Sequence, residues 1–492
     1  MKAASRAMID LQDVSFRYGD PDLAEPGAKL PLALDGVSLN VAAGEVVVLA
    51  GASGCGKTTV TRLVNGLLAG RGVATGKIRV SGLDPASTPT ALLARRVGSV
   101  FQDPRTQFFT TDVASELAFG CENLAVPPGQ AAERVAQVTA DWDLAGLLDR
   151  SVFALSGGQK QRVVCAAVEA LSPSVLVLDE PSANLDPPST ARLAEFIARW
   201  KAQGKAILVA EHRLAYLAAA ADRFIILKAG RVTHRLTASE ARALAPQAFA
   251  DLGLRPLESG QHPSWATDQS PLSPPPVDPA SDRIELRDVA YWRPHRGRRK
   301  RARQVLGIDR LDFLKGETVA LTGANGSGKT TLLRWLAGVA GGGRGQLRVD
   351  GEVWRARQRL GRVALVGQEV SRQLFADTVQ GELRLAERRL PADSVQAILD
   401  RLDLGHLVDR HPLTLSSGER QRLAIAAALA QERPIVALDE PTSGLDLAHM
   451  SQVASGIKEL AASGRTVLVA THDRDLLAAC AQRVVKLDQG RA

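Results

Sequence analysis

Cysteine and aromatic residues are scarce in this chain of 492 residues. The four cysteines are scattered and form no C-x-x-C pair, which argues against a disulfide framework, a zinc site or a cysteine-ligated iron–sulfur cluster. Reduced cytosolic thiols are the simpler interpretation. No apolar run approaches the roughly 18 residues that cross a bilayer, and the first residues lack the apolar core of a signal peptide. We expect a soluble, cytoplasmic chain that can still dock on a membrane protein.

The net charge of +8 is modest for this length. It permits a nucleic-acid or anionic-lipid partner but does not require one. A basic stretch, PHRGRRKRAR, occupies residues 294–303. It is interpreted as a solvated hairpin tip, or alternatively as a contact with lipid headgroups or RNA. Because it lacks interleaved aromatic residues for base stacking, a nucleic-acid partner is not expected.

Three segments occur twice in the chain. GASGCGKTT at 51–59 recurs as GANGSGKTT at 323–331, LSGGQKQR at 155–162 recurs as LSSGERQR at 415–422, and VLVLDEP at 175–181 recurs as IVALDEP at 435–441. Positions 155 and 415, 179 and 439, and 212 and 472 are each 260 residues apart. The chain therefore consists of two homologous halves. We assign 1–240 to the first half, 241–282 to an appendage and a Pro/Ser-rich linker, and 283–492 to the second half.

Both halves contain the phosphate-binding pattern G-x-x-x-x-G-K-[ST], known as a P-loop. Each copy follows an apolar, strand-like segment and precedes a helical pattern, which is the context that this motif requires. Glycines let the backbone curl around a phosphate, so that successive N–H groups face the anion. Lys57 and Lys329 should reach the β- and γ-phosphates, and Thr58 and Thr330 should bind magnesium. The predicted nucleotide-binding residues are Gly51, Ala52, Ser53, Gly54, Cys55, Gly56, Lys57, Thr58 and Thr59, and Gly323, Ala324, Asn325, Gly326, Ser327, Gly328, Lys329, Thr330 and Thr331.

An acidic pair ends one apolar strand in each half: Asp179 and Glu180, then Asp439 and Glu440. A buried parallel strand delivers such carboxylates to the edge of the sheet where ligands bind. Alone, the pair could be a strand-end cap. Behind a P-loop, the aspartate suits the magnesium shell and the glutamate can polarise an attacking water. The predicted chemistry is hydrolysis of a phosphoanhydride with Mg2+ as cofactor.

The order P-loop, LSGGQ, acidic pair and histidine resembles the ATP-binding-cassette (ABC) ATPases over nearly the whole chain. The resemblance implies an α/β fold with two tandem P-loop NTPase domains. Each would have a mixed sheet core and a helical signature subdomain, at roughly 103–170 and 369–430. It also implies an intramolecular pseudo-dimer, in which each ATP lies between the P-loop of one cassette and the signature sequence of the other.

The resemblance also assigns roles to individual residues. Tyr18 would stack on adenine, whereas the equivalent position of the second half is Arg293, with Tyr291 and Trp292 beside it. The second signature departs from the pattern because Ser417 and Glu419 replace a glycine and a glutamine. The implied catalytic residues are Glu180, Glu440, His212, His472, Gln102 and Gln368. The implied metal ligands are Thr58, Gln102, Asp179, Thr330, Gln368 and Asp439. The implied signature residues are Ser156, Gly157, Gly158 and Gln159, and Ser416, Ser417, Gly418 and Glu419.

The segment FQDPRTQFFTTDVASELAF at 101–119 resembles the ATPases of energy-coupling factor transporters, which import vitamins and transition-metal ions into prokaryotes. In that class, this region forms the groove for a coupling helix of the membrane subunit. Val113, Leu117 and Phe119 would form an apolar strip, and Glu116 and Glu382 would face basic residues of the partner. The alternative is that Glu116 is an ordinary solvated helix residue. The second half lacks FQDP.

The function expected from this resemblance is ATP hydrolysis that powers uptake of a vitamin or metal ion. The expected partners are a transmembrane coupling subunit and a small membrane solute-binding subunit. The expected location is the cytoplasmic face of a prokaryotic membrane, with peripheral attachment. The alternative is a soluble tandem ABC ATPase that acts on ribosomes or nucleic acid, against which the Pro-rich linker argues. The transported solute cannot be read from the ATPase sequence.

Overall fold

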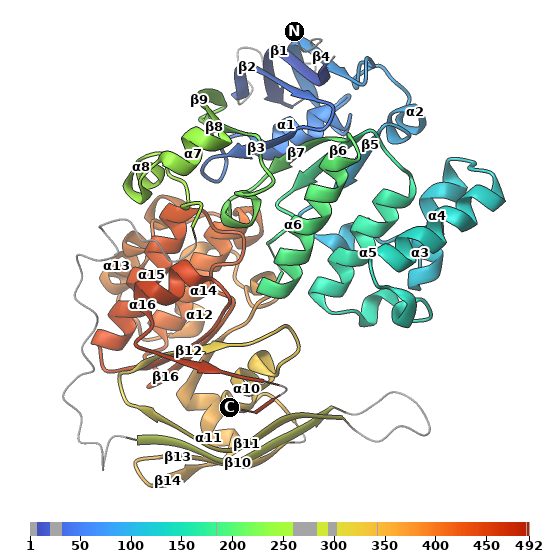
Figure 1. The fold of residues 1–492 in the computed structure, drawn as a ribbon. Coiled ribbons are helices and arrows are strands. Elements are labelled where there is room, and N and C mark those ends of the chain that lie inside the picture. The colour runs from blue at the N-terminus through green and yellow to red at the C-terminus, as the bar shows by residue number, and fades with distance from the viewer. Residues whose placement is uncertain are drawn as a thin grey trace. The chain divides into compact units, whose positions relative to one another are not determined.

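The computed structural model describes residues 7–19, 32–183, 185–258, 283–293, 303–341, 343–488 and 490–491. The chain divides into two compact units between Glu258 and Ser259 (Figure 1). Figure 1 colours the first unit from blue to green and the second from yellow to red. Of the predicted appendage and linker at 241–282, residues 259–282 lie outside the described residues, and so do residues 294–302 of the basic stretch at 294–303.

A mixed sheet and a smaller antiparallel sheet form the first unit. Its strands are β1 (Ala7–Tyr18), β2 (Leu32–Ala42), β3 (Val46–Ala50), β4 (Gly72–Val80), β5 (Val97–Val100), β6 (Val175–Asp179), β7 (Ala206–Ala210), β8 (Arg223–Lys228) and β9 (Arg231–Thr237). Its helices are α1 (Lys57–Val64), α2 (Thr90–Ala94), α3 (Val113–Asn123), α4 (Pro128–Asp141), α5 (Gly157–Ala170), α6 (Pro187–Ala202), α7 (Ala238–Ala243) and α8 (Pro246–Asp251). The larger sheet has the order β5-β6-β7-β3-β8-β9, and the smaller one has the order β2-β1-β4. Only β9 is antiparallel to its neighbour in the larger sheet of the described residues.

The second unit repeats this plan. Its strands are β10 (Arg283–Arg293), β11 (Arg303–Leu314), β12 (Thr318–Thr322), β13 (Gly343–Val349), β14 (Glu352–Trp354), β15 (Val363–Val366), β16 (Ile435–Asp439), β17 (Thr466–Ala470) and β18 (Arg483–Lys486). Its helices are α10 (Lys329–Leu336), α11 (Ala356–Arg362), α12 (Val379–Ala386), α13 (Ala392–Arg401), α14 (Ser417–Ala430), α15 (Leu447–Ala462) and α16 (Arg474–Cys480). The parallel sheet has the order β15-β16-β17-β12-β18, and the antiparallel sheet has the order β11-β10-β13-β14. The predicted fold class is therefore confirmed.

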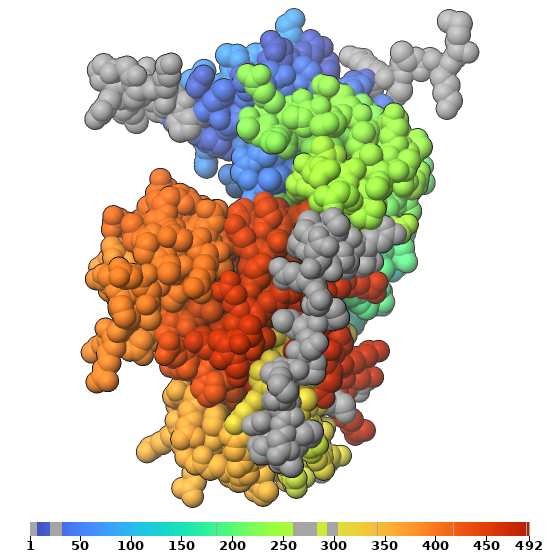
Figure 2. Space-filling view, turned by 90° about the vertical axis from the view of Figure 1, so that its left-hand side faces the viewer, coloured from blue at the N-terminus to red at the C-terminus, as the bar shows by residue number. Residues whose placement is uncertain are grey.

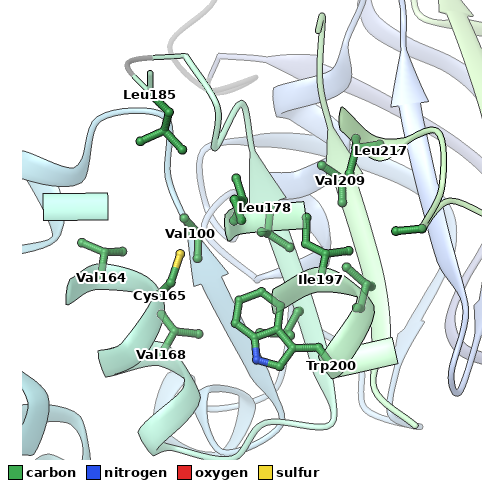
Figure 3. Close-up of a cluster of buried hydrophobic side chains, with 14 of the residues drawn as sticks. Val100, Val164, Cys165, Val168, Leu178, Leu185, Ile197, Trp200, Val209 and Leu217 are labelled. Atoms are coloured by element: carbon green, nitrogen blue, oxygen red, sulfur yellow. The ribbon is translucent and has the colours of Figure 1, made fainter. Parts of the chain in front are cut away.

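The central strands are buried on both faces, as their continuous apolar sequences predict. Figure 3 shows one side of this core, where Val100, Leu178 and Val209 of the sheet meet Cys165 of α5 and Trp200 of α6. Burying a valine or leucine side chain stabilises the fold by roughly 1.5–3 kcal/mol. Many such contacts fix the position of β6. They therefore also fix the acidic pair, which consists of the last residue of β6, Asp179, and the next residue, Glu180.

A helical subdomain interrupts each sheet between the P-loop helix and the acidic strand. In the first unit it contains α3, α4 and α5, and in the second it contains α12, α13 and α14. Figure 2 shows the region of α12 and α13 as an orange lobe beside the red C-terminal part of the same unit. Residues 241–258, which were assigned to the appendage, pack on the first unit through Phe249, Leu254 and Leu257. In the described part of the chain, no helix is both long and apolar enough to cross a bilayer.

Candidate nucleotide sites

The two P-loops have the same backbone geometry. Gly51 has φ of 152° and Gly323 has φ of 139°, and a Cβ on either would lie within 2.3 Å of the carbonyl oxygen of Leu227 or Leu487. Only glycine fits at these positions, since a larger residue would collide with the backbone of the neighbouring strand. Helices α1 and α10 begin directly at Lys57 and Lys329, so that their N-termini face the loops. This arrangement provides the backbone donors for a phosphate.

Both P-loop lysines are held above their loops by carbonyl oxygens. Lys57 Nζ donates to Gly51 O (2.8 Å) and Ala52 O (3.1 Å), and Lys329 Nζ donates to the corresponding Gly323 O at 2.5 Å. The two side chains are buried. Since a buried ammonium is costly without partners, these positions suit a lysine that neutralises phosphate charge.

The acidic strands place their aspartates beside the P-loop threonines. Thr58 Oγ1 donates to Asp179 Oδ1 at 3.2 Å, and the Thr330 side chain hydrogen-bonds Asp439. Burial, and next the adjacent Glu180 carboxylate, raise the pKa of Asp179 to about 6. Burial likewise raises the pKa of Asp439 to about 6. A hydroxyl and a carboxylate that already touch fit Mg2+, because oxygen donors are its preferred ligands.

The glutamates at the two sites contact the predicted histidines. His212 Nε2 lies 3.1 Å from Glu180 Oε1, and His472 Nε2 lies 2.8 Å from Glu440 Oε1. Glu180 and Glu440 have φ of 45° and 51°, a left-handed conformation that is uncommon for residues other than glycine. Such strain is concentrated at functional sites.

The predicted glutamines differ between the two sites. Gln102 Nε2 donates to Glu180 Oε2 at 2.7 Å, so the first site joins glutamine, glutamate and histidine. Within the described residues, no hydrogen bond joins Gln368 to Glu440. Instead, Thr471 Oγ1 donates to Glu440 Oε2 at 3.1 Å. The two sites therefore orient the same carboxylate with different neighbours.

Tyr18 lies next to the first P-loop. Its hydroxyl is 3.1 Å from Thr59 Oγ1, and its ring packs edge-on against Phe16. This position fits a base that stacks beside the P-loop. In the second cassette, Tyr291 pairs with Leu306 as Phe16 pairs with Leu34, which agrees with Arg293 as the counterpart of Tyr18. The Arg293 side chain lies outside the described part of the structure.

The signature serines begin helices α5 and α14. Ser156 and Gln159 form a reciprocal capping box, and Ser416 and Glu419 form the same one, in which Ser416 N donates to Glu419 Oε2 at 2.7 Å. The Glu419 carboxylate is therefore occupied by its own helix terminus. Glutamate replaces glutamine here without a change of local geometry, so the two signatures differ in charge. Whether each signature faces the other cassette's P-loop stays a prediction.

The interpretation of Glu116 and Glu382 as partner-facing residues is wrong. Both side chains are buried. Glu116 Oε2 accepts hydrogen bonds from Phe109 N (3.1 Å), Thr110 N (2.9 Å) and Thr110 Oγ1 (2.8 Å), and Glu382 Oε1 accepts from Phe375 N and Ala376 N. The alternative of a solvated helix residue is also wrong. Each glutamate fastens the preceding turn to the start of its helix.

This turn exposes an apolar residue in both cassettes. Phe109 is 70% exposed and Phe375 is 75% exposed. Phe109 stacks on Phe119 at 5.0 Å. A second exposed pair, Phe153 and Leu413, was missed from the sequence, although the 260-residue spacing relates them. The Val152 N–Thr111 O hydrogen bond brings the segment of Phe153 beside that of Phe109. Of the predicted apolar strip, Val113 and Leu117 are fully buried and belong to the core.

Comparison with known proteins agrees with the geometry. The family described as "ABC transporter" matches residues 34–183 and 307–443. A protein of Treponema denticola, named as an ABC transporter ATP-binding protein, is 38% identical over 98% of this chain and 96% of its own length. The chain therefore belongs to the ABC transporter family, and it is a tandem ABC ATPase with two cassettes.

Among the solved structures that match both cassettes are two with known protein names. The RNase-L Inhibitor covers 98% of this chain and 89% of its own, with a TM-score of 0.65 and 23% identity. A complex of the archaeal ribosomal stalk protein aP1 with the archaeal ribosome recycling factor aABCE1 covers 97% of this chain and 89% of its own, with a TM-score of 0.63 and 24% identity. At this identity, the likeness shows the fold.

These comparisons overturn two expectations. The predicted role in solute uptake by an energy-coupling factor type transporter is contradicted, and so are its membrane partners, because the solved structures that match both cassettes include an RNase-L Inhibitor and a ribosome recycling factor. The expectation that nucleic acid is an unlikely partner is opposed by the same findings. The family itself implies binding of ATP with Mg2+ and ATP hydrolysis. The predicted location at a membrane stays a prediction.

Proposed function

We propose that this chain is a tandem ABC ATPase that uses ATP-driven motions of its two cassettes to act on the ribosome. The observation that supports hydrolysis is the pair of Glu–His contacts, Glu180 with His212 and Glu440 with His472. Each glutamate directly follows the aspartate that contacts a P-loop threonine. The choice of target follows the earlier alternative of a soluble tandem ATPase. It draws on the RNase-L Inhibitor and the archaeal ribosome recycling factor, two of the solved proteins that match both cassettes.

The chemistry assigns one task to each residue of the first site. Lys57 leaves its carbonyl partners to neutralise the β- and γ-phosphates. The Thr58 hydroxyl and the Asp179 carboxylate would hold Mg2+, which neutralises phosphate charge when it is bound. Glu180 accepts a hydrogen bond from the attacking water and orients it. His212 Nε2, 3.1 Å from Glu180, holds that carboxylate and would donate its N–H to the γ-phosphate instead once ATP is bound.

The second site has the same set of groups in Lys329, Thr330, Asp439, Glu440 and His472. Because Glu440 is oriented by Thr471 rather than by a glutamine, its turnover is expected to differ from that of the first site. We propose that both sites are hydrolytically competent and unequal. Binding of ATP would close the two cassettes on each other, and hydrolysis with product release would reopen them.

The exposed apolar residues provide a candidate contact surface for the target. Phe109 and Phe153 in the first cassette, and Phe375 and Leu413 in the second, are all more than 60% exposed. Large exposed apolar side chains mark protein contacts when they gather in one place. They suit a ribosomal protein better than RNA, since RNA is bound chiefly through cationic contacts with phosphate. The net charge of +8 favours approach to the anionic ribosome in general.

Co-sedimentation with purified ribosomes tests this proposal. The Glu180→Gln/Glu440→Gln variant should retain ATP and pellet with ribosomes in ATP more than in ADP. Adding Phe109→Ser and Phe375→Ser should weaken binding by roughly tenfold, as expected for two central apolar contacts. Leu92→Ser, at a 52% exposed residue elsewhere on the first cassette, is the matched control and should have no effect. If the chain pellets with membranes and never with ribosomes, the target is wrong.

A further inference from the structure

Glu211 is a buried carboxylate to which the hydrolysis scheme gives no task. It directly precedes His212 and is 2% exposed. Its Oε1 accepts hydrogen bonds from His212 N (2.8 Å) and Arg213 N (3.1 Å). Its Oε2 accepts from Ser182 Oγ (2.7 Å) and Tyr216 Oη (3.0 Å). Four donors satisfy this carboxylate, as a buried carboxylate requires.

Among the donors to Glu211, Ser182 lies closest in sequence to the catalytic glutamate Glu180. It is fully buried, and it opens residues 182–186, the segment between the acidic strand β6 and helix α6. Glu180 lies only two residues before it. Glu211 therefore fastens the start of this segment to the turn that carries His212. Tyr216 donates to the same carboxylate oxygen as Ser182. Burial, and next the Glu211 carboxylate, raise the pKa of Tyr216 well above its ordinary value, so its hydroxyl stays protonated and acts as a donor.

The second cassette makes the same connection with a carboxylate at a different position. Residues 260 positions later than Ser182, Glu211 and Tyr216 are Thr442, Thr471 and Leu476. Thr471 has no carboxylate. Instead, Asp473, which follows His472, accepts a hydrogen bond from Thr442 Oγ1 at 2.8 Å. Asp473 also accepts from Asp475 N at 3.2 Å and caps helix α16.

The hydroxyl after the acidic strand is thus held by a buried carboxylate in both halves. The carboxylate precedes the histidine in one half and follows it in the other. A residue kept only for packing has no reason to reappear as a carboxylate at a shifted position that contacts the same hydroxyl. The shared feature is the link between the histidine turn and the start of segments 182–186 and 442–446.

We propose that Glu211 and Asp473 are positioning residues for ATP hydrolysis, each coupling its histidine turn to the segment that follows the catalytic glutamate. This inference rests on the hydrolysis proposed above and not on the identity of the target. When the histidine turn moves, the hydroxyl-bearing segment must move with it. The expected consequence of breaking the link is loss of turnover with nucleotide binding retained.

Three variants of the first cassette test the link. Glu211→Thr removes the carboxylate and leaves Ser182 and Tyr216 without their acceptor. Ser182→Ala removes the other side of the same contact. The triple variant Glu211→Thr/Arg213→Asp/Tyr216→Leu rebuilds the arrangement of the second cassette, and its third change avoids an unpartnered hydroxyl. Glu195→Thr, at an exposed glutamate of α6, is the matched control.

Steady-state kcat and KM for ATP are measured for each variant in the otherwise wild-type chain and in the Glu440→Gln background. The proposal is judged in whichever of the two backgrounds the variant loses more of its kcat. Glu211→Thr and Ser182→Ala should each lower kcat by at least about tenfold, with KM changed by less than about threefold. The triple variant should recover at least about half of the wild-type kcat.

Thermal unfolding of each variant separates positioning from folding. The proposal is overturned if Glu211→Thr keeps the wild-type kcat. It is also overturned if Glu211→Thr lowers both kcat and the melting temperature, and the triple variant then restores the melting temperature but not kcat. Absence of ATP hydrolysis by the wild-type chain itself would instead refute the proposed function.

Discussion

Replacing Glu116 by alanine should destabilise the first cassette before it affects any partner. The Glu116 carboxylate is 5% exposed and accepts hydrogen bonds from two backbone N–H groups and one hydroxyl at 2.8–3.1 Å. Removing the carboxylate leaves these donors without an acceptor in a partly buried turn. Hydrogen bonds to charged groups contribute about 1.5–3 kcal/mol each, and some of the loss is recovered by water. We expect Glu116→Ala to lower the free energy of unfolding by about 3–5 kcal/mol.

Urea unfolding of the full chain, followed by circular dichroism, measures this loss as a shift of the first transition. Glu116→Gln keeps an amide oxygen as acceptor and should lose only about 1–2 kcal/mol. Glu122→Ala, at an exposed glutamate of the same helix, is the matched control and should stay within about 0.5 kcal/mol of the wild type. The reasoning is refuted if Glu116→Ala is as stable as Glu122→Ala, because the carboxylate would then not fasten the turn.

Three further predictions concern the nucleotide sites. Gln102→Ala should reduce first-site turnover by roughly tenfold because Gln102 donates to Glu180 at 2.7 Å, whereas Gln368→Ala should change second-site turnover less. ATPase assays compare them, with Gln102→Ala measured in the Glu440→Gln background and Gln368→Ala in the Glu180→Gln background. Tyr18→Ala should raise the first-site Kd for ATP roughly tenfold if its ring stacks on adenine, as fluorescent-ATP titration would show, and an unchanged Kd would remove Tyr18 from the site. Glu419→Gln should leave the melting temperature unchanged, since an amide oxygen accepts the same bond from Ser416 N. If the second signature faces the first P-loop, as the family resemblance implies, Glu419→Gln should also tighten ATP binding at that site about threefold. Equal Kd values would show that its charge does not reach the nucleotide.

The sequence predicts the P-loops and acidic strands well because they are local. The glycine and lysine positions form a motif of fixed spacing, and continuous apolar strands can only be buried on both faces. The structure accordingly brings Lys57, Thr58, Asp179 and Glu180 to one sheet edge. The repeat extends the same assignment to the second half, where the acidic pair recurs 260 residues later and the P-loop lysine recurs as Lys329.

The direction of the Glu116 side chain could not be predicted in this way. Periodicity places Glu116 on a helix beside Leu117, but it does not show that the chain just before the helix turns back and supplies donors. Gln107 illustrates the same limit, since the spacing of residues does not show which groups its side chain contacts. The structure shows that it accepts from Phe101 N and donates to Ser99 O, inside its own turn.

The shared role of Glu211 and Asp473 could not be predicted by aligning the two halves. Aligning the halves pairs Glu211 with Thr471, so that a carboxylate is compared with a hydroxyl and no shared task is apparent. Only the contacts show that Asp473, two positions further on, does for Thr442 what Glu211 does for Ser182. The same carboxylate–hydroxyl contact can therefore be made in the two halves by residues at different positions of the repeat.

Steady-state ATP hydrolysis by the wild type, by Glu180→Gln and Glu440→Gln separately, and by the double variant tests the central claim most directly. Each single variant should lose a different part of the turnover, and the double variant should lose at least about a hundredfold while its Kd for ATP changes by less than about threefold. If the double variant hydrolyses ATP as the wild type does, these glutamates do not orient the attacking water and the account of both sites is wrong.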